Sequence, residues 1–442
     1  MLTRGRKARV AVRPEAAHAA LPPLPLPCVL DVLSRLAPGE RLLSSAVSRA
    51  WRAAVSQPSL WASVDLFTAS PHTASDALLA AIVSKVAGQL KSLRWCVGNP
   101  KGGVLTGAVL AFVTANAGNL RRLDMQNMPL TANNYFMQSL SKGEVVTLLH
   151  SAPGLLSFET DVNCTFQDAQ ALLAGQEKYN VVHIRRLYVE RCSGEEVTKL
   201  TLLLPSLQLL GLTKTPLDTP AVLGALVDAA IAFGFTGLYI ADCKLGPQSA
   251  SHLSRLLHDA PRLSTLLIDS DHVFDAASAP VLALALRTSS LIFLQLEAVG
   301  LWQHDDVGSV LVDALVGHPT LQEISFAFNP TAFEFYPQNT VGHCWARLVT
   351  SNCASLHTLS FAHCDVGDDV LGPLFAALAS NTTLRTVHLQ GNGVSMPFAR
   401  DVVLPSIFAN NALRKIVLFD ALFEEESIPE LLEAEALVAA RR

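Results

Sequence analysis

The chain of 442 residues has no apolar run near the ~20 residues that a membrane-spanning helix requires, although half of its residues are hydrophobic. Its most apolar stretch, residues 202–212, is interrupted by Pro205, Ser206 and Gln208. The mean hydropathy of +0.33 therefore indicates a large buried core and no membrane span. The N-terminus also lacks the charged, apolar and cleavage regions of a signal peptide, which argues against secretion.

Signature motifs of catalysis are missing as well. Residues 99–103 are rich in glycine but lack the Gly-Lys-Ser/Thr of a phosphate-binding loop. The sequence holds no Gly-x-Ser-x-Gly and no recognisable Cys–His nucleophile pair. The metal-ligand residue types at 304–306 and 363–369 fall in expected turns, where Asp favours a helix start. We therefore expect no enzyme activity, no cofactor and no metal. The net charge of −5 also argues against nucleic-acid binding.

What the chain does contain is one apolar pattern that recurs twelve times: apolar, two spacers, apolar, one spacer, apolar. Successive copies start 23 to 35 residues apart, most often 28. Such a period predicts a solenoid, in which each unit buries its apolar face against its neighbours. The twelve starts are Leu90, Leu120, Leu155, Ile184, Leu207, Phe235, Leu263, Leu291, Leu321, Leu356, Leu384 and Leu413.

Within a copy, the apolar period changes from that of a strand to that of a helix. In the copy at Leu384, the inward positions Val387 and Leu389 alternate with polar residues, which predicts a short strand. After the turn of another copy, Val370 and Leu374 are spaced by four residues, which predicts a helix. Each copy is therefore expected to be a strand–turn–helix unit.

The ninth position of the pattern is Asn or Cys in six copies. A buried Asn there can bond backbone groups of the turn that leaves the strand, and Cys can fill the same site as a weak donor. Because cysteines in non-adjacent units are too far apart for disulfides, we expect reduced thiols and an intracellular protein. The six residues are Asn163, Cys192, Cys243, Asn329, Cys364 and Asn392.

These units resemble leucine-rich repeats, and the 28-residue spacing with a full helix resembles the ribonuclease-inhibitor-like class. The resemblance covers roughly 350 residues of the chain. It implies an α/β solenoid of about twelve strand–turn–helix units, whose concave face is available to another macromolecule.

A different segment precedes the repeats. Residues 24–38 read Leu-Pro-Leu-Pro-Cys-Val-Leu-Asp-Val-Leu-Ser-Arg-Leu-Ala-Pro, with an apolar face at helical spacing. Residues 47–52 read Val-Ser-Arg-Ala-Trp-Arg, and residues 57–61 read Gln-Pro-Ser-Leu-Trp. A helical bundle of this size buries little core by itself and exposes apolar residues that favour a partner.

This segment resembles an F-box over about residues 22–66. Leu-Pro, the apolar helix, Val-Ser-Arg-x-Trp-Arg and Pro-Ser-Leu-Trp follow the family, whereas Pro27 stands where the family often has Glu and Arg41 where it often has Leu. The resemblance implies docking onto a Skp-type adaptor, with Leu60 and Trp61 at the junction with the first repeat. The residues expected at the adaptor are Leu24, Pro25, Val32, Leu33, Leu36, Leu42, Val47 and Trp51.

Through the adaptor, an F-box protein joins a cullin–RING ubiquitin ligase. The resemblance thus implies a non-catalytic subunit that holds a protein substrate for ubiquitin-dependent degradation. The substrate is expected on the concave face, where outward Tyr, Phe and Arg side chains are frequent interface hot spots. The candidates are Arg94, Arg122, Arg186, Tyr188, Tyr239, Asp269, Phe293 and Glu297, basic in the early units and acidic in the middle ones.

The 35-residue unit between Leu321 and Leu356 adds an aromatic-rich insertion. An insertion of this composition either packs against its own unit or contacts a partner, and both interpretations stay open. Its substrate-binding candidates are Phe333, Phe335 and Tyr336, and Phe328 and Trp345 belong to the same unit.

The expected organisation is a disordered basic tail at 1–20, an F-box at 21–66, the solenoid at 67–423 and an acidic capping helix at 424–442. The basic tail fits a nuclear signal, a transit peptide or a solvated end. At the other end, Ser427 and Glu430 have the spacing of a capping box. The helix that this box would open has an apolar face of Leu431, Leu432, Leu437 and Val438.

Two other functions fit the sequence. One is a leucine-rich-repeat scaffold or inhibitor without any ligase link, in which residues 22–66 are only a cap. The other is a small-GTPase regulator, because GTPase activators of the Ran type also use ribonuclease-inhibitor-like repeats. Those activators have a catalytic Arg or Asn near the N-terminus and a strongly acidic tail, whereas here an F-box-like segment comes first and the acidic stretch is short.

Overall fold

The computed structural model describes residues 24–36, 38–66, 81–83, 88–97, 107–127, 140–165, 167–168, 170, 182–203, 207–303, 306–330, 338–419 and 428–441. The expected basic tail at 1–20 and the candidates Phe333, Phe335 and Tyr336 lie outside these ranges. Within them, no helix is long and apolar enough to cross a membrane.

Three short helices open the described chain: α1 (Leu26–Arg35), α2 (Pro38–Ser44) and α3 (Arg49–Val55). Proline stands in the first turn of α1, where its missing N–H costs nothing. Ser48 Oγ caps α3 by accepting a hydrogen bond from Trp51 N at 3.2 Å. A 3₁₀ turn, η1 (Pro58–Trp61), follows. The fully buried Trp61 donates from Nε1 to Val55 O at 2.7 Å and so fixes the turn to the end of α3.

After this module, the described chain builds one sheet of thirteen strands in sequence order, all paired in parallel. Every predicted repeat start lies two residues from the start of one of the strands β2–β13. The strands are β1 (Ser63–Asp65), β2 (Ser92–Val97), β3 (Arg122–Asn127), β4 (Ser157–Cys164), β5 (Val182–Glu190), β6 (Leu209–Thr213), β7 (Gly237–Ala241), β8 (Thr265–Asp269), β9 (Phe293–Glu297), β10 (Glu323–Ser325), β11 (Thr358–Ser360), β12 (Thr386–His388) and β13 (Lys415–Val417).

The first strand, β1, was not among the predicted twelve. Trp61, Val64 and Leu66 nevertheless have the same spacing as the apolar positions of the other copies, and all three are buried. Val64 pairs with Leu93 of β2. The sheet therefore begins inside the segment that resembles an F-box, before the expected boundary at residue 67.

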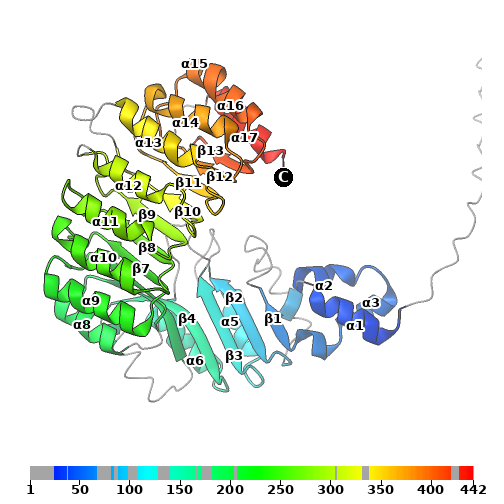
Figure 1. Ribbon diagram of the computed structural model, residues 1–442. Helices are drawn as coiled ribbons and strands as arrows, with labels where there is room; N and C mark the ends of the chain where they lie inside the picture. Colours follow the sequence, from blue (N-terminus) through cyan, green and yellow to red (C-terminus); the bar gives the residue numbers. More distant parts are fainter. Residues whose placement is uncertain are drawn as a thin grey trace, which may run out of the picture.

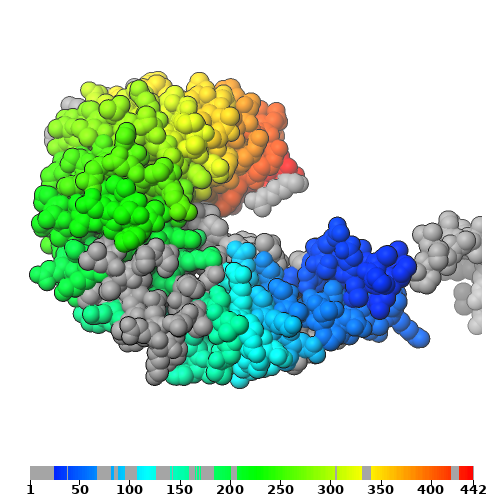
Figure 2. All heavy atoms as spheres, turned by 60° about the horizontal axis from the view of Figure 1, so that its bottom comes forward, coloured from blue at the N-terminus to red at the C-terminus, as the bar shows by residue number. Residues whose placement is uncertain are grey.

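Helices connect the strands and lie on the outer side of a curved sheet, whereas the strands line the inner side (Figure 1). This alternation confirms the predicted α/β solenoid. The three opening helices stand at its N-terminal end, away from the C-terminal units (Figure 2). The connecting helices are α5 (Gly107–Ala115), α6 (Lys142–Ser151), α8 (Gly194–Leu203), α9 (Pro220–Phe233), η3 (Pro247–Ser249), α10 (Ala250–Asp259), α11 (Ser278–Arg287), α12 (Val307–Leu315), α13 (Gln338–Thr350), α14 (Asp368–Ser380), α15 (Met396–Phe398), η4 (Ala399–Val403), α16 (Leu404–Ala409) and α17 (Pro429–Ala439).

One backbone conformation recurs where the chain leaves the strands β5–β12. The eighth position of all eight units has a positive φ, between 49° and 71°. Residues other than glycine rarely adopt this region, so the surrounding turn must stabilise it. The eight residues are Arg191, Lys214, Asp242, Ser270, Ala298, Phe328, His363 and Gly391.

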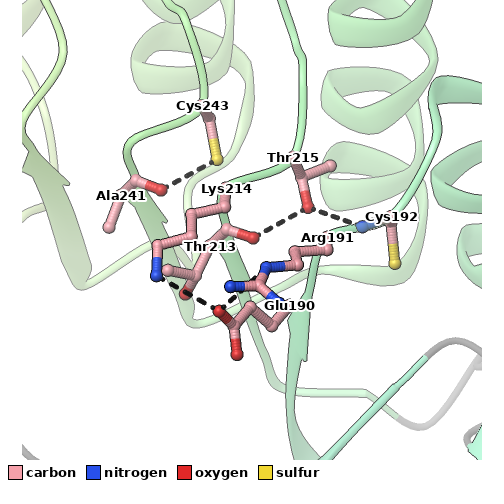
Figure 3. A network of polar contacts seen from close by, with 8 residues as sticks. All are labelled: Glu190, Arg191, Cys192, Thr213, Lys214, Thr215, Ala241 and Cys243. Carbon is pink, nitrogen blue, oxygen red and sulfur yellow. Dashed lines mark hydrogen bonds and ion pairs between the residues drawn. The ribbon is translucent and has the colours of Figure 1, made fainter.

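The side chain at the ninth position supplies that stabilisation, as predicted for Asn and Cys. Asn329 Oδ1 accepts hydrogen bonds from Val299 N and Leu301 N of the preceding unit, and its Nδ2 donates to three carbonyls. Cys243 Sγ donates to Ala241 O at 3.2 Å, as Figure 3 shows. Stacked units are thus joined by side chain–backbone bonds as well as by the sheet.

Thr215 and Asp271 perform the same task, although neither was predicted to do so. Thr215 Oγ1 accepts from Cys192 N and donates to Thr213 O, both at 3.1 Å (Figure 3). Asp271 accepts from the backbone N–H groups of Cys243 and Leu245. Hydroxyl and carboxylate oxygens accept as Asn does, so the ninth position admits more residue types than the repeat pattern suggests.

In the 35-residue unit, packing is the correct interpretation for Trp345. Its side chain is fully buried, with its ring 6.1 Å from that of Trp302 and 3.9 Å from that of Phe361. Phe328 is 38% exposed and stacks on His363 with 4.7 Å between ring centres. Trp345 thus extends the core between neighbouring units, whereas Phe328 packs on His363 at the surface.

The last helix, α17, closes the C-terminal end of the core. It begins at Pro429 with Ile428 as its N-cap, and proline is preferred at the first helical position. Ser427 of the predicted capping box lies outside the described residues. Leu432, expected on the apolar face, is 44% exposed. Glu435 accepts hydrogen bonds from the backbone N–H groups of residues 418 and 419, just after β13.

Candidate adaptor interface and concave surface

The opening helices expose an unusual share of the large apolar side chains. Five of the fourteen exposed large hydrophobic residues in the described chain fall within residues 24–47. We call these five the N-terminal apolar set. Several exposed apolar side chains on so small a module are typical of an interaction site. The set comprises Leu24 (56% exposed), Leu26 (49%), Val32 (41%), Leu43 (76%) and Val47 (66%).

Most of the predicted adaptor residues are accessible, with one clear exception. Leu24, Pro25, Val32 and Val47 are exposed, and Leu36, Leu42 and Trp51 are partly buried. The prediction that Leu33 faces an adaptor is wrong, because its side chain has no exposed surface. Leu33 and Val29, one helical turn apart, lie on the inner face of α1, which packs against α3. Leu26 and Leu43 are exposed residues that the resemblance to the family did not single out.

Arg41, which departs from the family pattern, holds the opening module together. Its guanidinium donates to Ser34 O, Leu36 O and Leu60 O, each at 2.8 Å. The first two carbonyls lie at the C-terminal end of α1, where helices leave acceptors unsatisfied. The same guanidinium lies 5.9 Å from the ring centre of Trp61, and burial lowers the pKa of Arg41. A leucine could not bridge these carbonyls, so Arg41 has a structural role here.

The concave surface differs from the prediction at three positions, because three residues expected to be exposed there are buried. The ring of Tyr188 leans over Gly211 of the next strand, so close that a Cβ at Gly211 would lie 2.2 Å from it. Phe293 lies in register between Thr265 and Glu323 of the flanking strands. Glu297 accepts a 2.5 Å hydrogen bond from Ser325 Oγ of the next strand. All three lie against residues of the adjacent strands.

The other concave candidates of the described chain keep accessible surface. Arg122 is exposed, and Arg94, Arg186, Tyr239 and Asp269 are intermediate. Arg94 lies between two carboxylates of adjacent strands, 3.6 Å from Asp65 and 3.5 Å from Asp124. The pair with Asp65 is exposed and contributes at most ~1 kcal/mol to stability, whereas Asp124 is buried.

Charged side chains of both signs lie at the middle units of the concave face. Glu190 lies 3.3 Å from the ammonium of Lys214 and 3.5 Å from the guanidinium of Arg191 (Figure 3). Two strands further on, burial and then the carboxylates of Asp269 and Glu297 raise the pKa of Tyr239. Burial likewise raises the pKa of Asp269, partly offset by its hydrogen bond with Ser270. Ion-paired groups of both signs at β5 and β6 are thus followed by carboxylates on β8 and β9.

The described residues also include some of the chemical groups noted in the sequence. They contain no group of three or more His, Cys, Asp or Glu side chains arranged for a metal. Of the metal-ligand types noted in the sequence, His363 stacks on Phe328, and Cys364 donates to Phe326 O. The six cysteines with described side chains are free, and burial raises the pKa of Cys192, Cys243 and Cys364 to about 12. Thiols with such pKa values are poor nucleophiles.

Comparison with known proteins gives one family match. Residues 21–66 match the F-box-like family. No curated protein matches the chain. Among solved structures, the chain is similar to one described as the crystal structure of the Rad7 and Elc1 complex in yeast, with 13% identity over 92% of this chain and 90% of that chain. The TM-score is 0.41.

Proposed function

We propose that the chain is a substrate-recognition subunit of a Skp–cullin–F-box ubiquitin ligase. In this role, the opening helices bind a Skp-type adaptor, and the concave face of the solenoid binds a protein substrate. The chain itself carries no catalytic residue. An intracellular location, cytoplasmic or nuclear, goes with the role.

One coincidence carries this proposal. The segment that matches the F-box-like family, residues 21–66, is also the segment that contains the N-terminal apolar set. Burying such side chains against a partner is favourable by roughly 25 cal/mol per Å² of apolar surface. Leu33, Val55 and Trp61 meanwhile form a core beneath them, so the module has an inside and a separate apolar outside.

Under this proposal the mechanism is proximity. A substrate held on the solenoid experiences a high local concentration of the conjugating enzyme that the cullin–RING part brings. For short connections such effective concentrations reach the millimolar range. A continuous sheet suits this task, because β1 pairs directly with β2 and couples the opening module to the first units.

We further propose that the repeating units belong to the ribonuclease-inhibitor-like class of leucine-rich repeats. The inward apolar positions, the left-handed eighth residue and the bonded ninth side chain support this assignment. The same order of strand, turn and outer helix recurs from β5 to β13.

The direct test is binding of a purified Skp-type adaptor to the full chain. Val47→Arg places a charge in the N-terminal apolar set, on a side chain that is 66% exposed and therefore expendable for folding. Leu284→Arg on α11 is the matched control, because Leu284 is 69% exposed but lies in the solenoid. The proposal predicts binding by the intact chain and the control, and a loss of at least about tenfold for Val47→Arg.

Absence of adaptor binding by the intact chain would contradict the ligase role. The opening helices would then be a cap of an interaction scaffold or inhibitor. A small-GTPase regulator would instead change the rate of GTP hydrolysis by a Ran-type or Ras-type GTPase, which the same purified chain can be used to measure.

A further inference from the structure

A pocket of about 370 Å³ opens where six consecutive strands begin. Most of its walls come from residues directly before the strands β6–β11 and from first residues of these strands, and Arg186 within β5 adds one side. We call it the edge groove. It is lined by Arg186, Gln208, Leu209, Thr236, Ser264, Thr265, Ile292, Phe293, Gln322, Glu323 and His357.

The floor of the edge groove is apolar and fixed. Leu209, Gly237, Thr265 and Phe293 are in register on β6–β9. Because Gly237 has no side chain, Leu209 lies over it, and a Cβ at Gly237 would be 2.7 Å from Leu209 Cδ1. Leu209 and Phe293 are 5% and 6% exposed and are supported by the adjacent strands. Ile292 stands at the side and is 42% exposed.

The rim of the groove is polar but close to neutral. Hydroxyls of adjacent units tie it together: Thr236 Oγ1 donates to Gln208 O, and Ser264 Oγ donates to Thr236 O. The Gln208 and Gln322 side chains are exposed at either side. The ionisable side chains of the lining are one guanidinium (Arg186), one carboxylate (Glu323) and one imidazole (His357).

These features select the class of ligand. The volume is at the low end of the ~300–1,000 Å³ of small-molecule sites and suits one or two side chains. The lining has one arginine, whereas a nucleic-acid site needs several cations for phosphates. From Gln208 before β6 to Gln322 before β10 is four strand spacings, or about 19 Å, the length of about six extended residues.

We propose that the edge groove binds an extended, uncharged segment of the protein substrate. A bulky apolar side chain of that segment enters the groove above Leu209, Thr265 and Phe293. The carboxamides of Gln208 and Gln322 bond its backbone. This inference rests on the proposed function for the identity of the ligand as a substrate, but the groove and its preference can be tested without an adaptor.

The test is selection of random heptapeptides displayed on phage by the full chain, followed by fluorescence anisotropy with labelled synthetic peptides. Thr265→Trp fills the groove. Thr386→Trp is the matched control, because Thr386 begins β12 as Thr265 begins β8, has similar exposure and lies outside the lining. Adaptor binding is measured on the same three proteins.

The expected result is enrichment of peptides with an aromatic or large aliphatic residue among neutral polar ones. Their affinity for Thr265→Trp should be at least about tenfold lower than for the intact chain. The same loss is expected when the aromatic or large aliphatic residue of the peptide is replaced by Ala or Lys. Thr386→Trp should bind as the intact chain does. Absence of enrichment, a charged consensus, or equal binding by Thr265→Trp would each overturn the inference. Peptide selection without adaptor binding would contradict the proposed function but support the groove as a peptide site. Adaptor binding without peptide selection would support the proposed function and overturn the inference about the groove.

Discussion

Asn329 gives the sharpest test of how stacked units are held together. It is fully buried, and among the described residues the backbone N–H groups of Val299 and Leu301 bond to its Oδ1 alone, at 3.0 and 3.3 Å. Two of the three carbonyls that its Nδ2 contacts have a second donor: Cys364 Sγ on Phe326 O, and the Ala298 N–H on Ala327 O. Asn329→Ala therefore leaves chiefly two buried donors unsatisfied, at about 1–3 kcal/mol each, or roughly 4 kcal/mol together.

Asn329→Cys is the matched control for that substitution. In other units, Cys243 and Cys364 stand at the same position, where the thiol donates to carbonyls and accepts a backbone hydrogen bond from the ninth residue of the preceding unit, Thr215 and Asn329 respectively. A thiol at 329 would keep the bond from Val299 N and lose that from Leu301 N. The expected cost is then one unsatisfied donor, about 1–3 kcal/mol.

The assay is urea unfolding followed by circular dichroism, together with native-state hydrogen exchange of peptides that span residues 296–302. Exchange should accelerate most in the Ala variant, at this unit and its neighbours, because stability in a solenoid passes between adjacent units. An Ala variant within 1 kcal/mol of the intact chain, or a Cys variant as damaged as the Ala variant, would refute the reasoning.

Three further predictions follow from the packing and charge of the described residues. Gly308→Ala in α12 should lower the free energy of unfolding, measured by thermal denaturation, by about 1–3 kcal/mol, because the new Cβ would lie 1.9 Å from the ring of Trp302. Gly372→Ala in α14 is the control: its Cβ would meet only Phe398, at 3.9 Å, so the change should be neutral or stabilising. Burial, and then Lys415, lower the pKa of His388 to about 4, so protonation of this group favours the unfolded chain. The free energy of unfolding should therefore be highest above pH 6.5 and fall by up to about 3 kcal/mol towards pH 4. His388→Gln should remove that part of the pH dependence. Leu33→Ala should reduce the free energy of unfolding by about 2–5 kcal/mol, and so lower both the melting temperature and adaptor binding. Val47→Arg should lower adaptor binding alone. A Leu33→Ala variant that loses adaptor binding but keeps its melting temperature would be inconsistent with the burial of Leu33.

The period of the sequence was enough to predict the architecture. Each inward leucine or valine marks a strand, because a solenoid unit must bury the same positions in every copy. The strand β1 was not predicted, because Trp61 and Val64 replace the usual leucines and the spacing falls within a segment that resembles an F-box. The bonding roles of Thr215 and Asp271 were not predicted, because hydrogen-bonding capacity, and not residue identity, defines the ninth position.

The candidate sites were harder to predict, since exposure depends on neighbours that are distant in sequence. Tyr188 and Glu297 were expected on the concave surface from their outward strand positions. Gly211 lets the Tyr188 ring lie flat, and Ser325 takes Glu297 into a buried hydrogen bond. Similarly, Val32 and Leu33 are neighbours in the sequence and were both expected at the adaptor. The packing of α1 on α3 buries Leu33 and leaves Val32 exposed.

The most direct test of the proposed function is hydrogen exchange of the full chain with and without a purified Skp-type adaptor. The account predicts that the adaptor slows exchange in peptides covering α1 and α2, where the N-terminal apolar set lies, and leaves the sheet from β5 to β13 unchanged. Unchanged exchange throughout residues 24–47 at saturating adaptor, or protection confined to the solenoid, would contradict it.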